Sequence, residues 1–289
     1  MDQEIILSDT DFERFREFFY KKTGILFDSN KRYFVDRRLC ERIKAKGFKD
    51  FRSYFIYLRF DKSERELQEL INTMTVNETY FFREAYQFEC MVKRVLPEII
   101  SRKNSGELIR IWSIPSSTGE EPYSIAIYLL EYWPDIETWD VEIISSDINT
   151  HVLNCAKRGI YSERSLKNLP PHLLIKYFDP LGKRTYKIKD DLISSIEFIR
   201  VNLVDREDSK KYRNFDIIFC RNLLIYFDDA SRKMAAENLY DALNPEGFLF
   251  LGHSESMSRI SPIFKVRKFP EAIAYQKPLE VRHPCKKSW

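Results

Sequence analysis

The chain has 289 residues, which is enough to bury a substantial core in one large domain or in two unequal ones. Its formal net charge is +3 with 31% charged residues, so the overall charge indicates neither a nucleic acid nor a membrane surface as a partner. No apolar run approaches membrane-spanning length, and the first residues lack the basic and apolar regions of a signal peptide. We therefore expect a monomeric, cytoplasmic protein that does not insert into a membrane.

Cysteine and histidine usage argues against a disulfide framework and against a metal centre. The 5 cysteines are scattered without C-x-x-C spacing, so reduced thiols are expected. Cys220 lies inside an apolar run and is expected to belong to the core. The 4 histidines are also scattered, which predicts no metal site.

Residues 1–75 are predicted to form a small all-helical domain. Asp9 to Asp11 can cap a first helix, a second runs from about Ser29 to Lys46, and further helical segments cover 50–59 and 64–71. One face of the second helix is basic and could dock an acidic partner, although an ordinary solvated surface has the same pattern. The candidate docking residues are Arg37, Arg38, Arg42 and Lys44.

Residues 76–92 are predicted to link this domain to the next one and to contribute to a ligand pocket. Polar side chains alternate here with three consecutive aromatic residues, Tyr80 to Phe82. We interpret the segment as a pocket roof whose polar groups reach a ligand held by the second domain. The structural alternative makes Asn77 a helix cap and Phe81–Phe82 an interdomain plug.

Strands and helices alternate over residues 93–277, as in a doubly wound α/β fold. The opening strand, Leu108 to Ile114, leads through a turn of small residues into a helix, and such a turn presents backbone N–H groups to a ligand. This turn lacks the G-x-G-x-x-G spacing and a P-loop lysine, and it ends in Glu120 and Glu121. Because two carboxylates repel pyrophosphate and attract a cation, S-adenosylmethionine (SAM) is the favoured ligand.

The second strand, Val141 to Asp147, also ends in an acid. A carboxylate at this position commonly accepts both ribose hydroxyls of a nucleotide. Asp147 precedes Asn149 and Thr150, however, so a helix-capping role stays open.

The α/β alternation is interrupted over about 160–195. This insertion is predicted to be a small antiparallel β subdomain with a turn at Asp179 to Gly182. Buried strands at 215–220 and 248–253 and an antiparallel closing pair follow. The polar tail, 278–289, is expected to be disordered.

Several strings of residues resemble one family closely. They are Asn77-Glu-Thr-Tyr-Phe-Phe-Arg83-Glu, Ser117-Thr-Gly-Glu-Glu-Pro-Tyr-Ser124, Ser146-Asp147-Ile, Phe219-Cys-Arg-Asn-Leu-Leu-Ile-Tyr-Phe227 and Gly252-His-Ser-Glu255. The chain resembles the chemotaxis receptor glutamate O-methyltransferase (CheR) family over roughly residues 8–277. The resemblance implies a class I SAM-dependent methyltransferase fold, Rossmann-like, with a mostly parallel sheet and an antiparallel last strand.

The resemblance also implies roles for individual residues. Arg83 and Tyr226 would line the reacting centre and act in catalysis. The cofactor-binding positions would be Asn77, Thr79, Arg83, Glu120, Glu121, Asp147, Asn202, Leu203, Arg221 and Asn222. The substrate would be a glutamate on the cytoplasmic helical domain of a chemoreceptor, the product S-adenosylhomocysteine (SAH), and no metal would take part.

The chemistry suits the residues present. A glutamate carboxylate, with a pKa of about 4.3, is already ionised at neutral pH and needs no general base. The Asn-Pro-Pro-Tyr motif of enzymes that methylate base amines is absent, as are base-stacking motifs, so no nucleic acid substrate is expected. Arg83 would orient the incoming carboxylate, and Tyr226 would hold it or the sulfonium in line.

Two features depart from the family or leave alternatives open. Ile114-Pro115-Ser116 stands where the family usually has small residues such as Ala or Gly, which predicts weakened cofactor affinity with activity retained. Some family members grip the receptor's tail with the inserted hairpin, but its loop here, 179–185, is short, which favours tail-independent recognition. The alternatives are a methyltransferase acting on another carboxylate substrate and a non-catalytic regulator that binds SAM or SAH.

Overall fold

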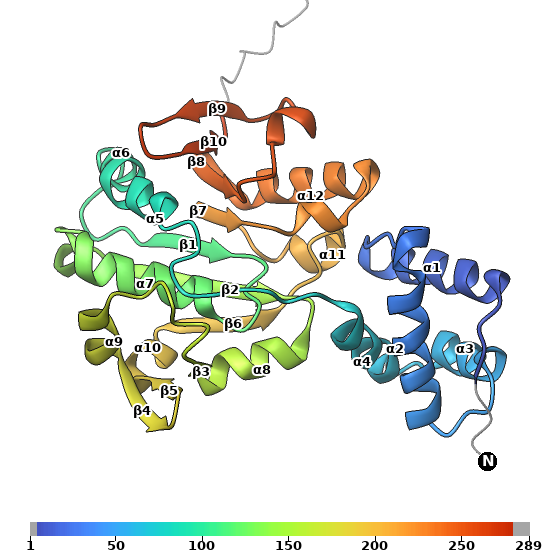
Figure 1. The fold of residues 1–289 in the computed structure, drawn as a ribbon. Coiled ribbons are helices and arrows are strands. Elements are labelled where there is room, and N and C mark those ends of the chain that lie inside the picture. Colours follow the sequence, from blue (N-terminus) through green and yellow to red (C-terminus); the bar gives the residue numbers. More distant parts are fainter. Residues whose placement is uncertain (1–4, 280–289) are drawn as a thin grey trace, which may run out of the picture.

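A computed structural model of the chain describes residues 5–279, which form an all-helical domain beside a larger α/β domain (Figure 1). The helices of the first domain are α1 (Asp9–Thr23), α2 (Arg32–Ala45), α3 (Phe51–Phe60) and α4 (Arg65–Met74). Their apolar stripes meet in one core that includes Phe15, Leu39 and Tyr54. The cap of α1 is Ser8, one residue before the predicted cap, because Ser8 and Asp11 exchange side-chain and backbone hydrogen bonds.

The central sheet of the α/β domain has the strand order β6-β2-β1-β7-β8-β10-β9. The strands are β1 (Ile109–Ser113), β2 (Val141–Asp147), β6 (Ile196–Arg200), β7 (Phe215–Cys220), β8 (Leu243–Leu251), β9 (Lys265–Lys268) and β10 (Ile273–Gln276). The first five in spatial order are parallel, and β10 runs antiparallel to both of its neighbours. The predicted Rossmann-like sheet with an antiparallel last strand is confirmed.

Helices cover both faces of this sheet (Figure 1). They include α5 (Tyr86–Cys90) and α6 (Leu96–Ile100), joined by a π-helical turn, and α7 (Glu120–Tyr132), α8 (Thr150–Arg158), α11 (Arg206–Ser209) and α12 (Asp229–Ala242). One buried cluster contains Phe88, Ile125 and Phe219, and the other contains Trp112, Phe215 and Leu239. Apolar residues on both sides explain why the inner strands read as continuous apolar runs.

The insertion forms a separate three-stranded antiparallel sheet in the order β3-β5-β4. Its elements are β3 (Ile160–Ser162), α9 (Pro171–Tyr177), β4 (Phe178–Gly182), β5 (Thr185–Ile188) and α10 (Asp190–Ser194). The predicted turn at 179–182 is wrong, because these residues belong to β4. The chain reverses at Lys183–Arg184, where Arg184 has a φ of 61°. The two short helices were not predicted.

Some expectations concern absences or the ends of the chain. Within residues 5–279 no helix is long and apolar enough to cross a membrane, and no group of three or more metal-ligating side chains is present. Cys90, Cys155 and Cys220 carry free thiols, and Cys40 donates to the carbonyl of Ile5. Residues 280–289, which hold most of the expected tail and Cys285, lie outside the described part.

Candidate active site

A cavity of about 660 Å³ lies where the two domains meet the carboxyl edge of the sheet. Its walls come from the β1–α7 loop, the segment 74–83, the ends of β6 and β7, and the connection between α1 and α2. The predicted site residues that line it are Asn77, Thr79, Arg83, Glu121, Asp147, Asn202, Leu203, Arg221, Asn222 and Tyr226. Glu120 is not among the lining residues.

The two acids of the loop have different surroundings. Glu120 accepts from Thr118 Oγ1 at 2.6 Å and from Ser165 Oγ at 2.7 Å, on the side of the inserted subdomain. Glu121 points into the cavity and accepts from Ser113 Oγ at 2.8 Å. The difference follows from helix geometry, because neighbouring residues in a helix point about 100° apart. Burial raises the pKa of both carboxyls, and at Glu121 the charge of Arg221 opposes this rise.

Arg221 is buried in the cavity wall and pairs with Glu121. Its Nη1 lies 3.0 Å from Glu121 Oε2, its Nη2 donates to the carbonyl of Arg83 at 2.6 Å, and its guanidinium lies 5.4 Å from the ring centre of Phe88. Within residues 5–279 its Nε has no hydrogen-bond partner. Buried polar atoms are nearly always paired, so this nitrogen is a donor that a polar ligand could use.

Asp147 supports the loop from the neighbouring strand. One of its oxygens accepts from the backbone N–H of Ser117 and the other from that of Asn149, both at 2.9 Å. Burial raises the pKa of Asp147 to about 6, against these N–H groups, which lower it. Each oxygen keeps a second lone pair that a hydroxyl could use. The capping alternative for Asp147 is wrong, because Asn149 caps α8.

Gly119 allows the loop to pack closely. Its φ is 97°, and a Cβ there would lie 2.8 Å from the Cβ of Ala156 and 2.9 Å from Tyr161 Oη. Any larger residue would therefore displace the start of α7 and with it Glu121. Ile114 and Pro115, the departures from the family pattern, both line the cavity.

The segment 76–84 lines the cavity with Asn77, Thr79 and Arg83, but its aromatic residues do not form the interdomain plug. Phe81 packs edge-on against Tyr161 and Phe178, and both Phe81 and Phe82 belong to the core of the α/β domain. Asn77 caps no helix, and its carbonyl accepts from Ser117 Oγ at 3.2 Å. Arg83 and Tyr226 face the same cavity: burial raises the pKa of Tyr226, and the nearby charge of Arg83 lowers it.

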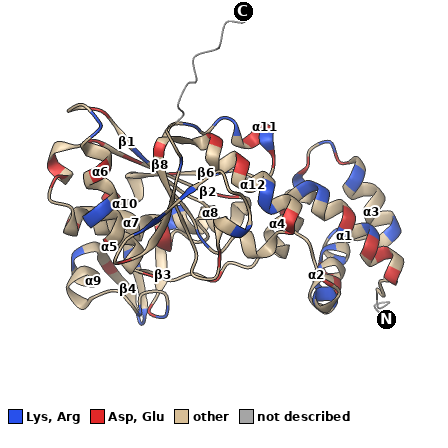
Figure 2. Cartoon of the chain, turned by 90° about the horizontal axis from the view of Figure 1, so that it is seen from above, with Lys and Arg blue, Asp and Glu red and all other residues tan. Residues whose placement is uncertain are grey.

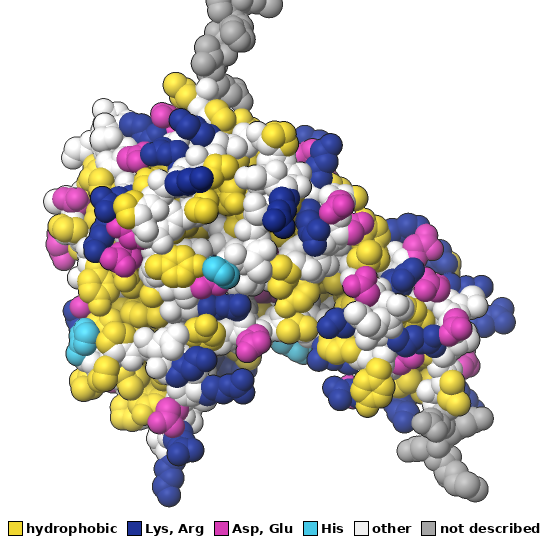
Figure 3. Space-filling model, turned by 45° about the horizontal axis from the view of Figure 1, so that its top comes forward, with side chains coloured by type: hydrophobic (Ala, Val, Ile, Leu, Met, Phe, Trp, Pro, Cys, Tyr) yellow, Lys and Arg dark blue, Asp and Glu magenta, His cyan; other side chains and the backbone are white. Residues whose placement is uncertain are grey.

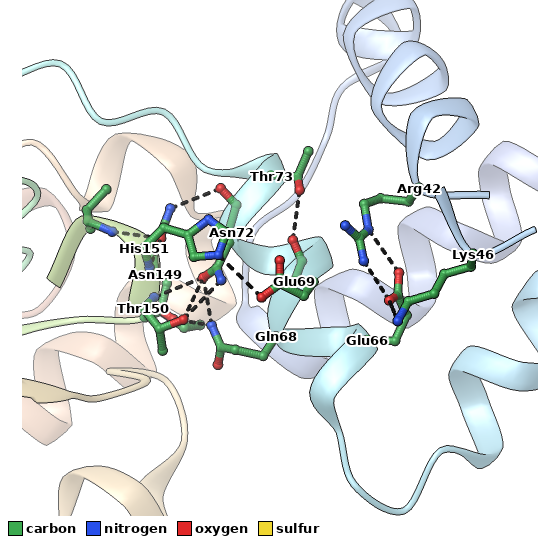
Figure 4. Close-up of polar contacts among 12 residues, drawn as sticks. Arg42, Lys46, Glu66, Gln68, Glu69, Asn72, Thr73, Asn149, Thr150 and His151 are labelled. Carbon is green, nitrogen blue, oxygen red and sulfur yellow. Dashed lines mark hydrogen bonds and ion pairs between the residues drawn. The ribbon is translucent and has the colours of Figure 1, made fainter. Parts of the chain in front are cut away.

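Hydrogen bonds from helix α4 join the all-helical domain to the residues that follow Asp147 (Figure 4). Asn72 Oδ1 accepts from the N–H of Thr150 at 2.9 Å, and its carbonyl accepts from Asn149 Nδ2 at 3.0 Å. Gln68 Nε2 donates to the carbonyl of Ile148 at 2.9 Å. Sequence reasoning missed Gln68 and Asn72, because nothing distinguishes them from other polar residues on an amphipathic helix.

The end of α1 and the residues that follow it make a second junction with the α/β domain. Ile25 forms an antiparallel bridge with Phe227, and Tyr20 Oη donates to Asp228 at 2.9 Å. Asn202 Nδ2 donates to the carbonyl of Lys22 at 2.8 Å. The all-helical domain therefore forms part of the cavity wall itself.

The predicted basic docking face lies on α2, whose Lys and Arg positions are blue in Figure 2, and it is only partly exposed. Arg37 and Lys44 are exposed, whereas Arg42 pairs with Glu66, which is fully buried (Figure 4). Arg38 donates to the carbonyl of Thr73, and its guanidinium lies 3.9 Å from the ring centre of Phe34. The interpretation of Arg42 as a docking residue is therefore corrected: its charge is used inside the domain.

Comparisons with known proteins agree with this architecture. Residues 10–75 match the family model described as CheR methyltransferase, all-alpha domain, and residues 77–273 match CheR methyltransferase, SAM binding domain. The chain is 56% identical over 275 residues to Chemotaxis protein methyltransferase 2 of Vibrio cholerae, covering 95% of each chain. It is 36% identical to Chemotaxis protein methyltransferase of Escherichia coli, covering 92% of this chain and 91% of that one.

Among solved structures, N-methyltransferase NodS from Bradyrhizobium japonicum in complex with SAH has a TM-score of 0.39 at 11% identity. The match covers 76% of this chain and 90% of that chain. The family models together cover nearly all of the described residues, in the order in which the two domains follow each other. The chain therefore belongs to the CheR methyltransferase family and is a SAM-dependent methyltransferase of chemotaxis.

Proposed function

We propose that this chain transfers a methyl group from SAM to glutamate carboxylates on the cytoplasmic helical domain of a chemoreceptor, giving methyl esters. The observation that carries the proposal is the ion pair between half-buried Glu121 and buried Arg221, in a cavity that Arg83 and Tyr226 also line. An amino acid zwitterion has an ammonium group that can bind the glutamate of such a pair and a carboxylate that can bind its arginine. The names of the relatives from Vibrio cholerae and Escherichia coli support a role in chemotaxis.

The lining residues fit SAM at each of its parts. Glu121 would bind the ammonium group, and the unpartnered Nε of Arg221 would donate to the carboxylate. Asp147 would accept the ribose hydroxyls with its free lone pairs, and Asn202 and Leu203 would flank the adenine. SAM supplies a methyl group on a positively charged sulfur when bound.

This chain's own residues then act by orientation. The incoming glutamate is ionised at neutral pH, so no general base is required. Arg83 attracts that carboxylate, and Tyr226 holds it in line. Alignment of this kind supplies several kcal/mol of the roughly 7–11 kcal/mol available to well-oriented reactions. The exposed Arg37 and Lys44 would dock the acidic helical surface of the receptor. Because that surface is cytoplasmic, we place the reaction in the cytoplasm.

The test is transfer of labelled methyl groups from SAM to purified receptor cytoplasmic fragments. The label should be released by mild base, as a glutamate ester requires, and should vanish when the modified glutamates are changed to alanine. Arg83→Ala should lose most of the transfer while it still binds SAH in calorimetry. Base-stable label would overturn the ester assignment. SAH binding without transfer to any receptor fragment would favour the non-catalytic regulator.

A further inference from the structure

Glu255 lies behind the loop that follows β7 and does not line the cavity. Its Oε2 accepts from the backbone N–H of Asn222 and of Gly252, both at 2.8 Å. Its Oε1 accepts from the N–H of Leu224 at 2.7 Å. One partly buried carboxylate thus collects backbone donors from the middle of a loop whose ends, Arg221 and Tyr226, both face the cavity.

The loop needs such an anchor because its backbone is unusual. Asn222 has a φ of 59°, a left-handed conformation that few non-glycine residues adopt. A short 3-10 turn, Leu224–Tyr226, follows immediately. The bond between the N–H of Leu26 and the carbonyl of Tyr226 is long, at 3.4 Å. The two short bonds from the N–H groups of Asn222 and Leu224 to Glu255 therefore restrain the middle of the loop, together with the bond from Arg232 Nε to the carbonyl of Leu224 at 3.0 Å.

Gly252 makes the contact possible. A Cβ at this position would lie 2.6 Å from Asn222 Nδ2, 2.9 Å from Asn222 N and 2.9 Å from Glu255 Oε2. Real Cβ atoms do not approach other atoms so closely. A side chain at Gly252 would thus separate the carboxylate from the loop. This close approach is an independent sign that the loop and the 252–255 turn are fitted to each other.

We propose that Glu255 is a positioning residue for methyl transfer, because its carboxylate holds the backbone at 222–224 and thereby sets where Tyr226 stands. The inference rests on the proposed function for its catalytic readout. Arg221 has restraints of its own from Glu121, Phe88 and the carbonyl of Arg83. Loss of Glu255 should therefore affect the Tyr226 end of the loop more than the cofactor end.

The first experiment compares Glu255→Gln and Glu255→Ala with the wild type. Gln keeps the shape but offers an acceptor at one end only, and Ala offers none. We expect kcat for receptor methylation to fall about 10-fold in Gln and about 100-fold in Ala, while the Kd for SAH changes less than about 3-fold. An unchanged kcat, or a kcat that falls only in proportion to SAH affinity, would overturn the proposal. If the Ala variant does not fold, the Gln variant decides.

Two further variants separate positioning from charge and from stability. Gly252→Ala keeps the carboxylate and displaces it, so kcat should fall as in Glu255→Gln. Asp50→Ala removes a helix cap far from the loop, which lowers stability, and should leave kcat unchanged. A normal kcat in Gly252→Ala would count against the proposal.

Amide exchange supplies a readout that needs no substrate. The N–H groups of Asn222 and Leu224 should exchange faster in Glu255→Gln, while strand β7 stays protected. If the wild-type chain transfers no methyl group, the proposed function fails, but exchange still decides this inference. Unchanged protection of Asn222 and Leu224 would overturn it.

Discussion

Two arginine–glutamate pairs, one in each domain and each with one buried member, differ in how completely their hydrogen bonds are satisfied; we call the first pair closed and the second open. Glu66 accepts from Arg42 Nε at 3.0 Å, from Arg42 Nη2 at 2.7 Å and from Tyr54 Oη at 2.8 Å, and Lys46 lies 3.2 Å away. In the cavity wall, Glu121 accepts from Ser113 and pairs with Arg221, which also lies 3.4 Å from Glu84. Arg221 Nε has no partner among the described residues. The first pair is complete, and the second has unused hydrogen-bonding capacity.

The pKa values follow this difference. Burial alone would raise the pKa of Glu66, but hydrogen bonds from Arg42, Tyr54 and Lys46 outweigh it and lower the pKa below its ordinary value. At Glu121 burial prevails over the charge of Arg221 and the pKa is raised. A carboxylate whose ionised form is incompletely compensated is a better receptor for a cationic ligand. The difference fits a structural role for the Arg42–Glu66 pair and supports the ligand-binding role that we propose for the Arg221–Glu121 pair.

Breaking the closed pair should have the largest effect. Arg42→Met leaves Glu66 buried with fewer partners, and we expect the free energy of unfolding to fall by about 3 kcal/mol in urea titrations. The loss should grow as pH rises above the ordinary pKa of glutamate, because the uncompensated charge forms there. The Kd for SAH, measured on folded protein, should stay unchanged. A stable Arg42→Met variant with weakened SAH binding would contradict the division of roles.

Breaking the open pair should affect binding more than stability. Arg221→Met removes the donor for the ligand carboxylate and leaves Glu121 without its cation, so the Kd for SAH should rise about 100-fold, or about 3 kcal/mol. Calorimetry measures the affinity, and thermal unfolding of the unliganded chain is the control. If Arg221→Met binds SAH normally but unfolds easily, the two pairs serve the same structural purpose.

Asp147 sharpens the comparison through pH. Its pKa of about 6 exceeds the ordinary aspartate value, so the folded chain pays for ionisation, and this group's contribution to stability declines as pH rises towards 6. The ionised form holds the N–H of Ser117, so SAH affinity should instead fall below pH 6, by up to about 10-fold per pH unit. Calorimetric titration with SAH across pH 5–8, which extends about one unit or more to each side of this pKa, measures the affinity. Asp147→Asn should flatten this part of the profile; an equal slope in both proteins would exclude Asp147 as the cause.

The smallest effect is expected at the exposed part of the basic face. Replacing Arg37 and Lys44 together with glutamate should lower kcat/KM for a receptor fragment about 3- to 10-fold through slower encounter, with SAH affinity unchanged. The difference should shrink at high salt, because exposed charges are screened. Glutamate substitution at Lys183 and Arg184, where the β4–β5 hairpin reverses, is the matched control. Figure 3 shows basic side chains protruding at the lower end of the larger domain. Equal losses in both double variants would show a general charge effect rather than docking at α2.

Much of the catalytic domain could be predicted from local patterns. The apolar run ending in Asp147, the fully apolar run at 215–220 and the closing antiparallel pair all form strands close to their predicted places. These strands are recognisable in the sequence because the sheet is buried on both faces, which requires apolar residues along its inner strands. The loop between Ile114 and Glu121 was located by its small residues, which only a tight strand-to-helix turn requires.

The misplaced residues share one physical cause. Arg42 has the sequence signature of a surface arginine, but Glu66, 24 positions further on, folds beneath it. The distinct surroundings of Glu120 and Glu121, and the bonds from Asn72 to the loop at 149–150, likewise join segments far apart in the chain. The spacing of residues within one helix or strand does not predict hydrogen-bond partners on another element.

The sequence by itself determined the family, the order of the strands along the chain and most of the residues that line the cavity, because these follow from local motifs and from hydrophobic periodicity. Only the tertiary structure decided which of two adjacent acids faces the cavity, which basic residues stay exposed and that Glu255 holds the loop before Tyr226. Those outcomes depend on directions and distances between elements, and they are fixed when the domains pack.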